Sequence, residues 1–307
     1  MTKAKAVLDI GSNTIRLLIA DVSTAPHKRI HYQHHIARLG EGLQKTGRLS
    51  DAGKARAMLV FQEVVKVCHS FGIAAEDIRA VATAAMRDAA NGATFVAEVA
   101  EKTGLNIQII GGEMEANLAL TGAQSGLPLN VSEQMLLFDI GGGSTEFSRI
   151  IDGQLVDNIS VKLGVVRLTE GIILTEPPST QNYEDLCNAA NVLLDEVEDF
   201  WGDSFTLPQY LVGTAGTVTT LAAIAQHMKV YDPELINNYE MTRSKFNEVK
   251  ANLLSKTNAE RLQICDLEAG REDVIIAGVA IVEMMFQRWS FPALVSVDSG
   301  LLEGLLH

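Results

Sequence analysis

Short apolar runs that end in Asp and Gly recur along this chain of 307 residues. The run 135–140 is apolar without a helical stripe, which predicts a buried strand. It is followed by a glycine turn and small polar residues, in the order Asp139, Ile140, Gly141, Gly142, Gly143, Ser144, Thr145 and Glu146. The start of the chain repeats this order with Asp9, Ile10, Gly11, Ser12, Asn13 and Thr14. Two copies of this motif, in which an apolar strand ends in Asp and a glycine turn, indicate an internally duplicated protein.

The remaining pattern alternates strands with amphipathic helices, which predicts an α/β fold. Strands are expected at 5–10, 15–22, 29–36, 77–83, 105–110, 135–140, 145–151, 154–162, 210–212 and 292–297. Helices are expected at 51–71, 91–102, 112–124, 165–174, 183–201, 244–255, 258–264, 273–289 and 301–306, and after Thr217. On the helix that Ser50 caps, the expected apolar side consists of Leu59, Val60, Val64, Val67 and Phe71. The helix 273–289 is mostly apolar and is expected to be buried.

Length, charge and cysteine content limit the classes of protein to which this chain can belong. The length favours two domains, with the turn formers at 126–130 as the best linker. A net charge of -13 argues against duplex nucleic acid as a partner, but a few clustered cationic side chains would still bind a small anionic substrate.

The cysteines Cys68, Cys187 and Cys265 form no CxxC pair, which favours a reducing compartment. The N-terminus lacks an apolar leader and no apolar run is long enough to span a bilayer, so we expect a cytoplasmic protein without a membrane partner.

The glycine turns suggest anion chemistry. Glycine lets backbone N–H groups approach phosphate closely, and neighbouring carboxylates can hold a hard cation. A third Gly/Thr loop, with Gly213, Thr214 and Gly216, joins a strand to a helix, where anions bind well. Arg87, in the loop after a strand, is placed to clamp phosphate, although a surface salt bridge explains it equally well. The ordinary alternative for each glycine turn is a tight hairpin.

Acids at the start of the helix after Gly112 permit two interpretations. They complement the helix dipole, or one of them acts as a general base. The spacing alone does not choose between these roles.

Taken together, the motifs resemble the exopolyphosphatase and guanosine-pentaphosphate phosphohydrolase family, within the actin, sugar-kinase and Hsp70-like superfamily. The resemblance covers nearly the whole chain. It is carried by the motifs at 9–14, 83–87, 112–116, 139–146, 213–217 and 298–304 in this order. It implies two ribonuclease-H-like domains with an active-site cleft between them. The expected domains are 1–125, joined by a closing helix at 299–307, and 126–298.

The resemblance also implies roles for individual residues. Glu115, Asp139 and Glu146 match catalytic acids, and Asp139, Glu146 and Asp9 are the expected ligands of Mg²⁺ or Mn²⁺. The expected phosphate-binding residues are Gly11, Ser12, Asn13, Thr14, Arg87, Gly141, Gly142, Gly143, Ser144, Thr145, Gly213, Thr214 and Gly216. The chain departs from the family at Met114, where a glutamate is usual, and carries its other acid at Glu113. It also ends near residue 307, without the extra C-terminal domain of longer members, which suggests a preference for short chains or another phosphorylated substrate.

The leading hypothesis is Mg²⁺-dependent release of terminal phosphate from inorganic polyphosphate. Within the family, the alternative is removal of the 5′ phosphate of guanosine pentaphosphate, and the sequence does not separate the two substrates. An ATP-dependent small-molecule kinase and a non-catalytic actin-like binding protein rank lower. We count a second copy of the chain, as a homodimer, among the candidate partners.

Overall fold

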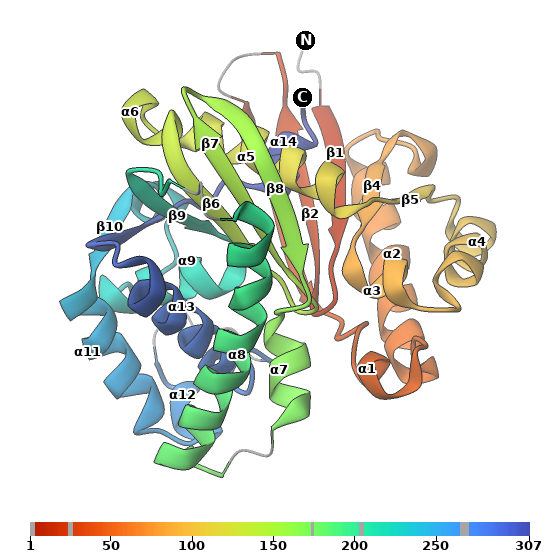
Figure 1. Cartoon of the computed structure of the whole chain (residues 1–307). Coiled ribbons are helices and arrows are strands. Elements are labelled where there is room, and N and C mark those ends of the chain that lie inside the picture. The colour runs from red at the N-terminus through yellow and green to blue at the C-terminus, as the bar shows by residue number, and fades with distance from the viewer. Residues whose placement is uncertain (1–3, 24–26, 173–174, 203–205, 265–269) are drawn as a thin grey trace. The chain divides into compact units, whose positions relative to one another are not determined.

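A computed structural model describes the chain except for residues 1–3, 24–26, 173–174, 203–205 and 265–269. The chain divides into two compact units. The first contains Met1–Ser125 and Leu301–His307, and the second contains Gly126–Gly300 (Figure 1). Each unit is an α/β fold around its own sheet, so the expected fold class is confirmed.

The first unit has a five-stranded sheet. Its strands run in the order β3 (Lys28–Ile36), β2 (Thr14–Asp21), β1 (Ala4–Ile10), β4 (Arg79–Ala82) and β5 (Ile107–Ile109). β1, β2 and β3 are antiparallel neighbours, whereas β4 and β5 run parallel to β1. Its helices are α1 (Leu43–Thr46), α2 (Asp51–Ser70), a 3₁₀ turn (Ala75–Asp77), α3 (Ala84–Asp88), α4 (Gly92–Thr103), α5 (Gly112–Gly126) and α14 (Leu301–Gly304).

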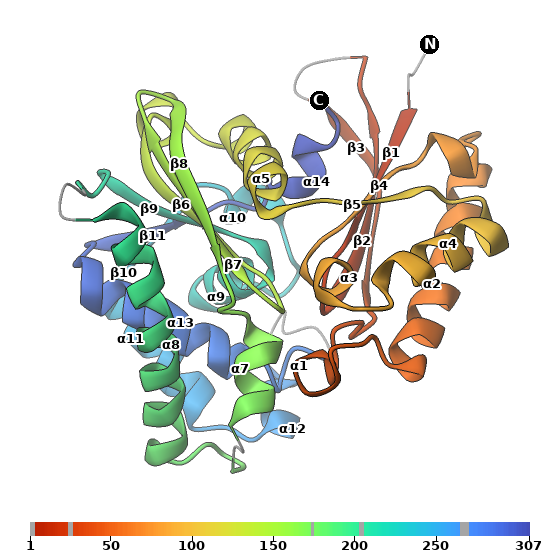
Figure 2. The ribbon, with the colours of Figure 1, turned by 45° about the vertical axis from the view of Figure 1, so that its right-hand side comes forward.

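Alternation along β1 assigns the two faces of this sheet, because successive strand side chains point to opposite sides. Leu8 and Ile10 pack in the same core as residues of α2 and α4, helices that lie to one side of the sheet in Figure 2. Val7 packs on the other face, against the closing helix α14. Asp9 therefore shares the α14 face of the sheet.

The expected apolar side of α2 is wrong in part. Leu59 is 68% exposed and Phe71 is 40% exposed. The buried stripe consists of Gly53, Ala57, Phe61, Val64 and Cys68. Apolar residues extend round more than one side of this helix, so composition alone did not identify the side that the sheet covers.

The second unit has a six-stranded sheet with the same central order. Its strands are β10 (Tyr239–Thr242), β11 (Ala293–Ser296), β9 (Tyr210–Thr214), β6 (Gln134–Ile140), β7 (Thr145–Ile151) and β8 (Gln154–Val161). Its helices are α6 (Leu129–Ser132), α7 (Val165–Gly171), α8 (Thr180–Trp201), α9 (Ala215–Ala225), α10 (Pro233–Ile236), α11 (Arg243–Leu254), α12 (Asn258–Arg261) and α13 (Ile275–Trp289). Again a meander of three strands is followed by parallel strands, which matches the duplication seen in the sequence.

The core of the second unit lies around α13, which is buried along most of its length, as its composition predicts. Phe138 and Ile140 of β6 join this core, so Asp139 points to the opposite face of the sheet. In both units, then, the strand-end Asp lies on the face away from the main helical core.

Several short elements were not expected from the pattern. α1, α6, α10 and β10 each span four residues, too few for a periodic signal. None of the helices in the described part of the chain is long and apolar enough to cross a bilayer. Cys68 and Cys187 are free thiols, and Cys265 lies outside the described residues.

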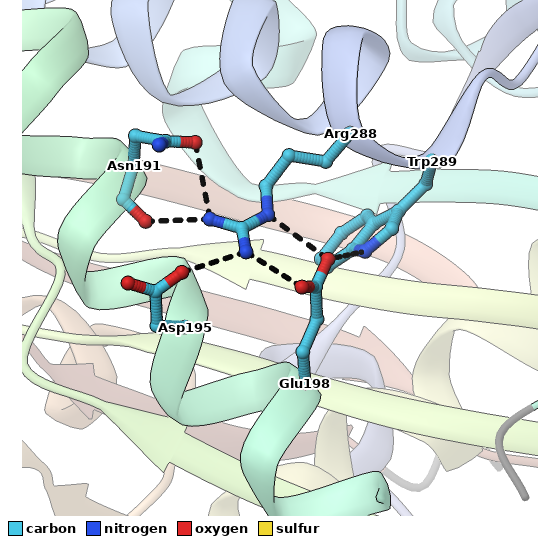
Figure 3. Close-up of polar contacts among 5 residues, drawn as sticks. All are labelled: Asn191, Asp195, Glu198, Arg288 and Trp289. Carbon is cyan, nitrogen blue, oxygen red and sulfur yellow. Dashed lines mark hydrogen bonds and ion pairs between the residues drawn. The ribbon is translucent and has the colours of Figure 1, made fainter. Parts of the chain in front are cut away.

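A polar network joins α8 to α13 at the edge of the core (Figure 3). Arg288 donates from Nε to Glu198 at 2.9 Å and from Nη2 to Glu198 and Asp195 at 2.6 and 2.7 Å. Its Nη1 also donates to the Asn191 carbonyl oxygen at 2.7 Å. The Trp289 indole completes the network by donating to Glu198 at 3.0 Å. One guanidinium thus holds successive turns of α8.

Replacing Arg288 with methionine should lower the melting temperature by about 2–4 °C, for a loss of about 1 kcal/mol. The hydrogen bond that Glu198 accepts from Arg288 lowers the pKa of Glu198, and burial raises this pKa by a smaller amount. The stabilisation is therefore complete above the ordinary pKa of 4.5 and fades as the pH falls through the lowered value. Thermal unfolding at pH 7 and pH 3 tests this. The gap between wild type and variant should narrow at pH 3, and a constant gap contradicts the ionic account. Lys245→Met, which removes an exposed pair with Glu248, is the control.

Candidate active site

The turn between β6 and β7 is built from the glycines that the sequence singled out. Asp139 pairs with Glu146, and Ile140 with Thr145, in the antiparallel register. The N–H of Gly141 donates to the Ser144 carbonyl oxygen at 2.9 Å and closes the turn. The Gly141 amide is therefore occupied, and it is not the phosphate donor that we expected.

The first turn of α7 orients the rest of this loop. The N–H of Val165 donates to the Gly141 carbonyl oxygen at 3.1 Å, and that of Val166 donates to the Gly142 carbonyl oxygen at 2.9 Å. Among the residues that the structure describes, no backbone carbonyl accepts from the N–H of Gly142 or Gly143. With the carbonyls turned toward α7, these two amides are available to an anion.

The two hydroxyls of the turn are used within the protein. Ser144 donates to Glu146 Oε1 at 2.7 Å, and Ser160 of β8 donates to the same oxygen at 2.7 Å. Thr145 donates to the Leu163 carbonyl oxygen. The hydroxyls thus orient the carboxylate and the loop, and backbone amides are left as the main anion donors.

Asp139 and Glu146 form a pair of carboxylates on neighbouring strands. Like charges directly opposite each other destabilise a sheet unless something neutralises them. Oxygen donors of this kind suit Mg²⁺, which commonly binds one or two carboxylates together with water and phosphate oxygens. No cluster of three or more His, Cys, Asp or Glu suited to a metal occurs among the described residues.

The first unit repeats this turn. The Gly11 N–H donates to the Thr14 carbonyl oxygen at 2.9 Å, which occupies the amide of this predicted phosphate-binding residue as well. The N–H of Gly40 donates to the Ser12 carbonyl oxygen at 2.8 Å, and that of Ala37 donates to the Asn13 carbonyl oxygen at 3.0 Å. Asn13 is buried, and among the described residues its side-chain Oδ1 accepts no hydrogen bond.

The residue opposite the strand-end Asp differs between the two copies. In the first unit Asp9 pairs with Arg16, whose Nε and Nη2 donate to Asp9 Oδ2 at 3.0 and 2.6 Å. Asp9 is thus neutralised by a guanidinium, whereas the strand register places Glu146 opposite Asp139. Asp9 is the partner of Arg16, and Asp139 and Glu146 are the pair that the register brings together. The metal role expected of these three acids stays a prediction.

Arg87 and Glu115 meet within the first unit. Arg87 lies on α3 rather than in the expected loop, and its Nη1 donates to Glu115 Oε2 at 3.1 Å and to the Ile110 carbonyl oxygen at 3.2 Å. Glu115 is 7% exposed, whereas Glu113 is exposed. A buried carboxylate oriented by an arginine suits a general base better than a freely solvated one does. The geometry supports Glu115 over Glu113.

The third glycine loop, with Gly213, Thr214 and Gly216, has a partly structural role. A Cβ on Gly213 would lie 2.6 Å from the Phe138 ring, so this glycine permits close contact within the core. Thr214 donates to the Ser299 carbonyl oxygen at 3.3 Å. Gly216, in the first turn of α9, receives Arg271 Nη1 on its carbonyl oxygen at 3.0 Å.

The sequence reasoning missed four polar residues around these loops, namely Arg16, Ser160, Arg167 and Arg271. Hairpin register would have found Arg16, because it lies opposite Asp9 across the turn. Arg167, which donates from Nε to the Gly143 carbonyl oxygen at 3.1 Å, lies at the start of a predicted helix. Arg271 had no local signal, because the chain brings it to Gly216 from 55 residues away.

Gly164→Ala should disrupt the second-unit turn. A Cβ on Gly164 would lie 2.3 Å from the Gly142 carbonyl oxygen and 2.4 Å from the Gly143 carbonyl carbon. Both are backbone atoms, so the glycine loop must shift to accommodate it. Since positioning dominates phosphoryl transfer, we expect kcat/KM for phosphate release to fall by about 10²-fold. Gly171→Ala, where a Cβ meets open space, is the matched control. Equal activity of the two variants contradicts this account of the turn.

Known proteins resemble the chain over nearly its full length. It is 32% identical over 317 residues to exopolyphosphatase 2 of Mycobacterium tuberculosis, covering 98% of this chain and 96% of that protein. It is 30% identical to a bifunctional 3-dehydroquinate synthase/phosphatase of Fusobacterium nucleatum, but spans only 46% of that relative.

Solved structures agree on the fold. A crystal structure of an exopolyphosphatase from Cytophaga hutchinsonii superposes with a TM-score of 0.90 over 99% of this chain and 96% of that chain, at 24% identity, which shows the fold alone. The Aquifex aeolicus PPX-GPPA enzyme is 29% identical, with a TM-score of 0.79 over 99% of this chain and 98% of that chain.

The model of the Ppx/GppA phosphatase family matches residues 18–307. The resemblance drawn from the sequence motifs is thereby confirmed. The chain belongs to the Ppx/GppA phosphatase family.

Proposed function

We propose that this chain is an exopolyphosphatase, which hydrolyses the terminal phosphoanhydride bond of inorganic polyphosphate with Mg²⁺. The observation that carries the proposal is the opposed pair Asp139 and Glu146 beside a glycine turn with available amides. A site of this kind suits a phosphate chain together with its counter-cation. The names of relatives that the chain covers almost completely support the same substrate.

Mg²⁺, held by Asp139 and Glu146, would neutralise phosphate oxygens and so stabilise the charge of the transferred group. The hydroxyls of Ser144 and Ser160 hold the Glu146 carboxylate in one orientation. The amides of Gly142 and Gly143 bind the anionic oxygens. Mn²⁺ would satisfy the same oxygen ligands.

Within the first unit, the proposed general base is Glu115. Glu115 accepts the proton of the attacking water, and Arg87 holds its carboxylate. A carboxylate that is already hydrogen-bonded and buried needs little reorganisation before it acts. Ser12, Asn13 and Thr14 are the candidate phosphate-binding residues of this unit.

A phosphate-release panel tests the substrate. Purified protein is incubated with short polyphosphate, long polyphosphate and guanosine pentaphosphate, each with Mg²⁺, with Mn²⁺ and with excess chelator. We expect cation-dependent release of phosphate from polyphosphate. Phosphate transfer from ATP to an acceptor, or nucleotide-dependent sedimentation without turnover, would instead favour the kinase or the actin-like binding protein.

Guanosine pentaphosphate is the second candidate substrate. The family model carries both names, and the Aquifex aeolicus relative is titled a PPX-GPPA enzyme. Removal of its 5′ phosphate would use the same amides and carboxylates. A higher kcat/KM for guanosine pentaphosphate than for every polyphosphate would make it the principal substrate.

We also infer a cytoplasmic location, which the free thiols of Cys68 and Cys187 support. Burial raises the pKa of each thiol to about 11, so both stay protonated and unreactive at neutral pH. A homodimer is the partner state that we propose to test, by light scattering of the purified protein.

A further inference from the structure

The three glycines of the turn between β6 and β7 are held by their carbonyl oxygens. The Gly141 carbonyl oxygen accepts from the N–H of Val165 at 3.1 Å. The Gly142 carbonyl oxygen accepts from the N–H of Arg167 at 3.2 Å. The third carbonyl, that of Gly143, is held by a side chain instead, because Arg167 Nε donates to it at 3.1 Å. Arg167 therefore contacts two successive peptide groups of the turn, one with its backbone and one with its guanidinium.

The direction of each carbonyl sets the direction of the amide that follows it. In a planar trans peptide, the C=O group and the next N–H group point in opposite directions. Because the three glycine carbonyls face α7 and Arg167, the N–H groups of Gly142, Gly143 and Ser144 face away from them. Within the described ranges, no carbonyl oxygen accepts from any of these three N–H groups. Successive N–H groups on one side of a turn form an anion-binding concavity, here with three donors.

The duplicated turn of the first unit anchors the corresponding carbonyl in another way. Asn13 corresponds to Gly143, because each follows its strand-end Asp at the same spacing. The Asn13 carbonyl oxygen accepts from the backbone N–H groups of Ala37 and Arg38 at 3.0 and 2.9 Å. Both turns thus hold this carbonyl, and the second unit does so with a side chain. A side chain can be replaced without changing the backbone, so the role of this contact can be tested.

We propose that Arg167 is a positioning residue for the terminal phosphate of the substrate. Its hydrogen bond to the Gly143 carbonyl oxygen orients the peptide between Gly143 and Ser144, so that the Ser144 N–H becomes a third donor to phosphate. The inference rests on the proposed function, in which the amides of Gly142 and Gly143 bind phosphate oxygens. The Ser144 hydroxyl keeps its separate role of orienting Glu146. A donor that is in place before the substrate arrives needs no reorganisation during the reaction.

Amide NMR signals test the proposal on the full chain, with inorganic phosphate and Mg²⁺ as the probe, because phosphate is not consumed. We expect phosphate to shift the amide signals of Gly142, Gly143 and Ser144 in the wild type. In Arg167→Met the Ser144 shift should be lost. The other two shifts should persist, since backbone N–H groups of α7 still hold the carbonyls that precede these amides. Loss of this charge-assisted contact should also lower kcat/KM for phosphate release about 10-fold.

Arg243→Met is the matched control. Arg243, at the start of α11, also donates from its guanidinium to a backbone carbonyl oxygen, that of Phe286 on α13. This variant should change thermal stability and keep all three amide shifts. If Arg167→Met does not fold, Arg167→Gln takes its place, because glutamine lacks both the charge and the length of arginine.

Two results would overturn the proposal. One is an Arg167→Met variant in which the Ser144 signal still shifts as in the wild type, whatever its thermal stability. The other is a wild type in which phosphate shifts Gly142 and Gly143 but not Ser144. A wild type that releases no phosphate but shows all three shifts would defeat the proposed function and leave the effect of Arg167 on anion binding to be read from the variant. A wild type with neither activity nor shifts would defeat both.

Discussion

Glu115→Gln is expected to lower kcat for phosphate release by about 10²–10⁴-fold, the usual contribution of a positioned general base. Glutamine keeps the shape of the side chain, and its carbonyl oxygen can still accept the Arg87 hydrogen bond that orients Glu115. The binding of polyphosphate should therefore change little. Because the base acts only as the water is deprotonated, the loss should appear in kcat and leave KM nearly unchanged. Initial rates over a range of polyphosphate concentrations measure both constants.

The helix itself offers a matched control. Glu113 lies in the same first turn of α5, but its side chain is exposed, so Glu113→Gln should retain activity within about two-fold of the wild type. Thermal unfolding should show both variants folded. An active Glu115→Gln enzyme, or equal losses in the two variants, would rule out Glu115 as the base.

Glu146→Gln should weaken the response to Mg²⁺. The wild type places Glu146 opposite Asp139, and a cation that binds both should raise the melting temperature in proportion to its occupancy. The glutamine oxygen can keep the hydrogen bonds from Ser144 and Ser160, so the turn should persist. We expect Mg²⁺ affinity to fall at least about 10-fold, and kcat/KM to fall by about 10²-fold or more.

Melting curves with and without Mg²⁺, together with rates across a Mg²⁺ titration, measure these effects. Asp152→Asn is the control, because Asp152 lies at the opposite end of the β7–β8 hairpin and has a positive φ of 52° that asparagine tolerates. It removes one carboxylate from the same hairpin without altering the pair. A Glu146→Gln variant with a wild-type Mg²⁺ response would show that the cation binds elsewhere.

Local patterns predicted most of the regular elements. The hairpin of β7 and β8 follows from its Asp-Gly turn, and Ser50 caps α2 as expected, because these signals act within a few residues. Predictions failed where packing decides. The side of α2 that faces the sheet and the packing role of Gly213 both depend on neighbours distant in sequence.

The candidate site, like the fold, was predicted from the sequence only in part. The glycine turns and their acids were visible in the sequence, but the use of each donor was not. Gly11 and Gly141 close their turns with the amides that we had assigned to phosphate. The pairing of Arg87 with Glu115 joins residues on α3 and α5, 28 positions apart, which no local pattern predicts.

By itself the sequence determined the duplicated motif of two strands joined by a glycine turn, because glycine turns and alternating strands are specified by neighbouring residues. The motifs of the sequence also identified the family. Only the tertiary structure decided which charge each acid meets, namely Arg16 for Asp9, Glu146 for Asp139 and Arg87 for Glu115. Strand pairing and helix packing set those distances, and an acid beside a cation differs chemically from an acid beside another acid.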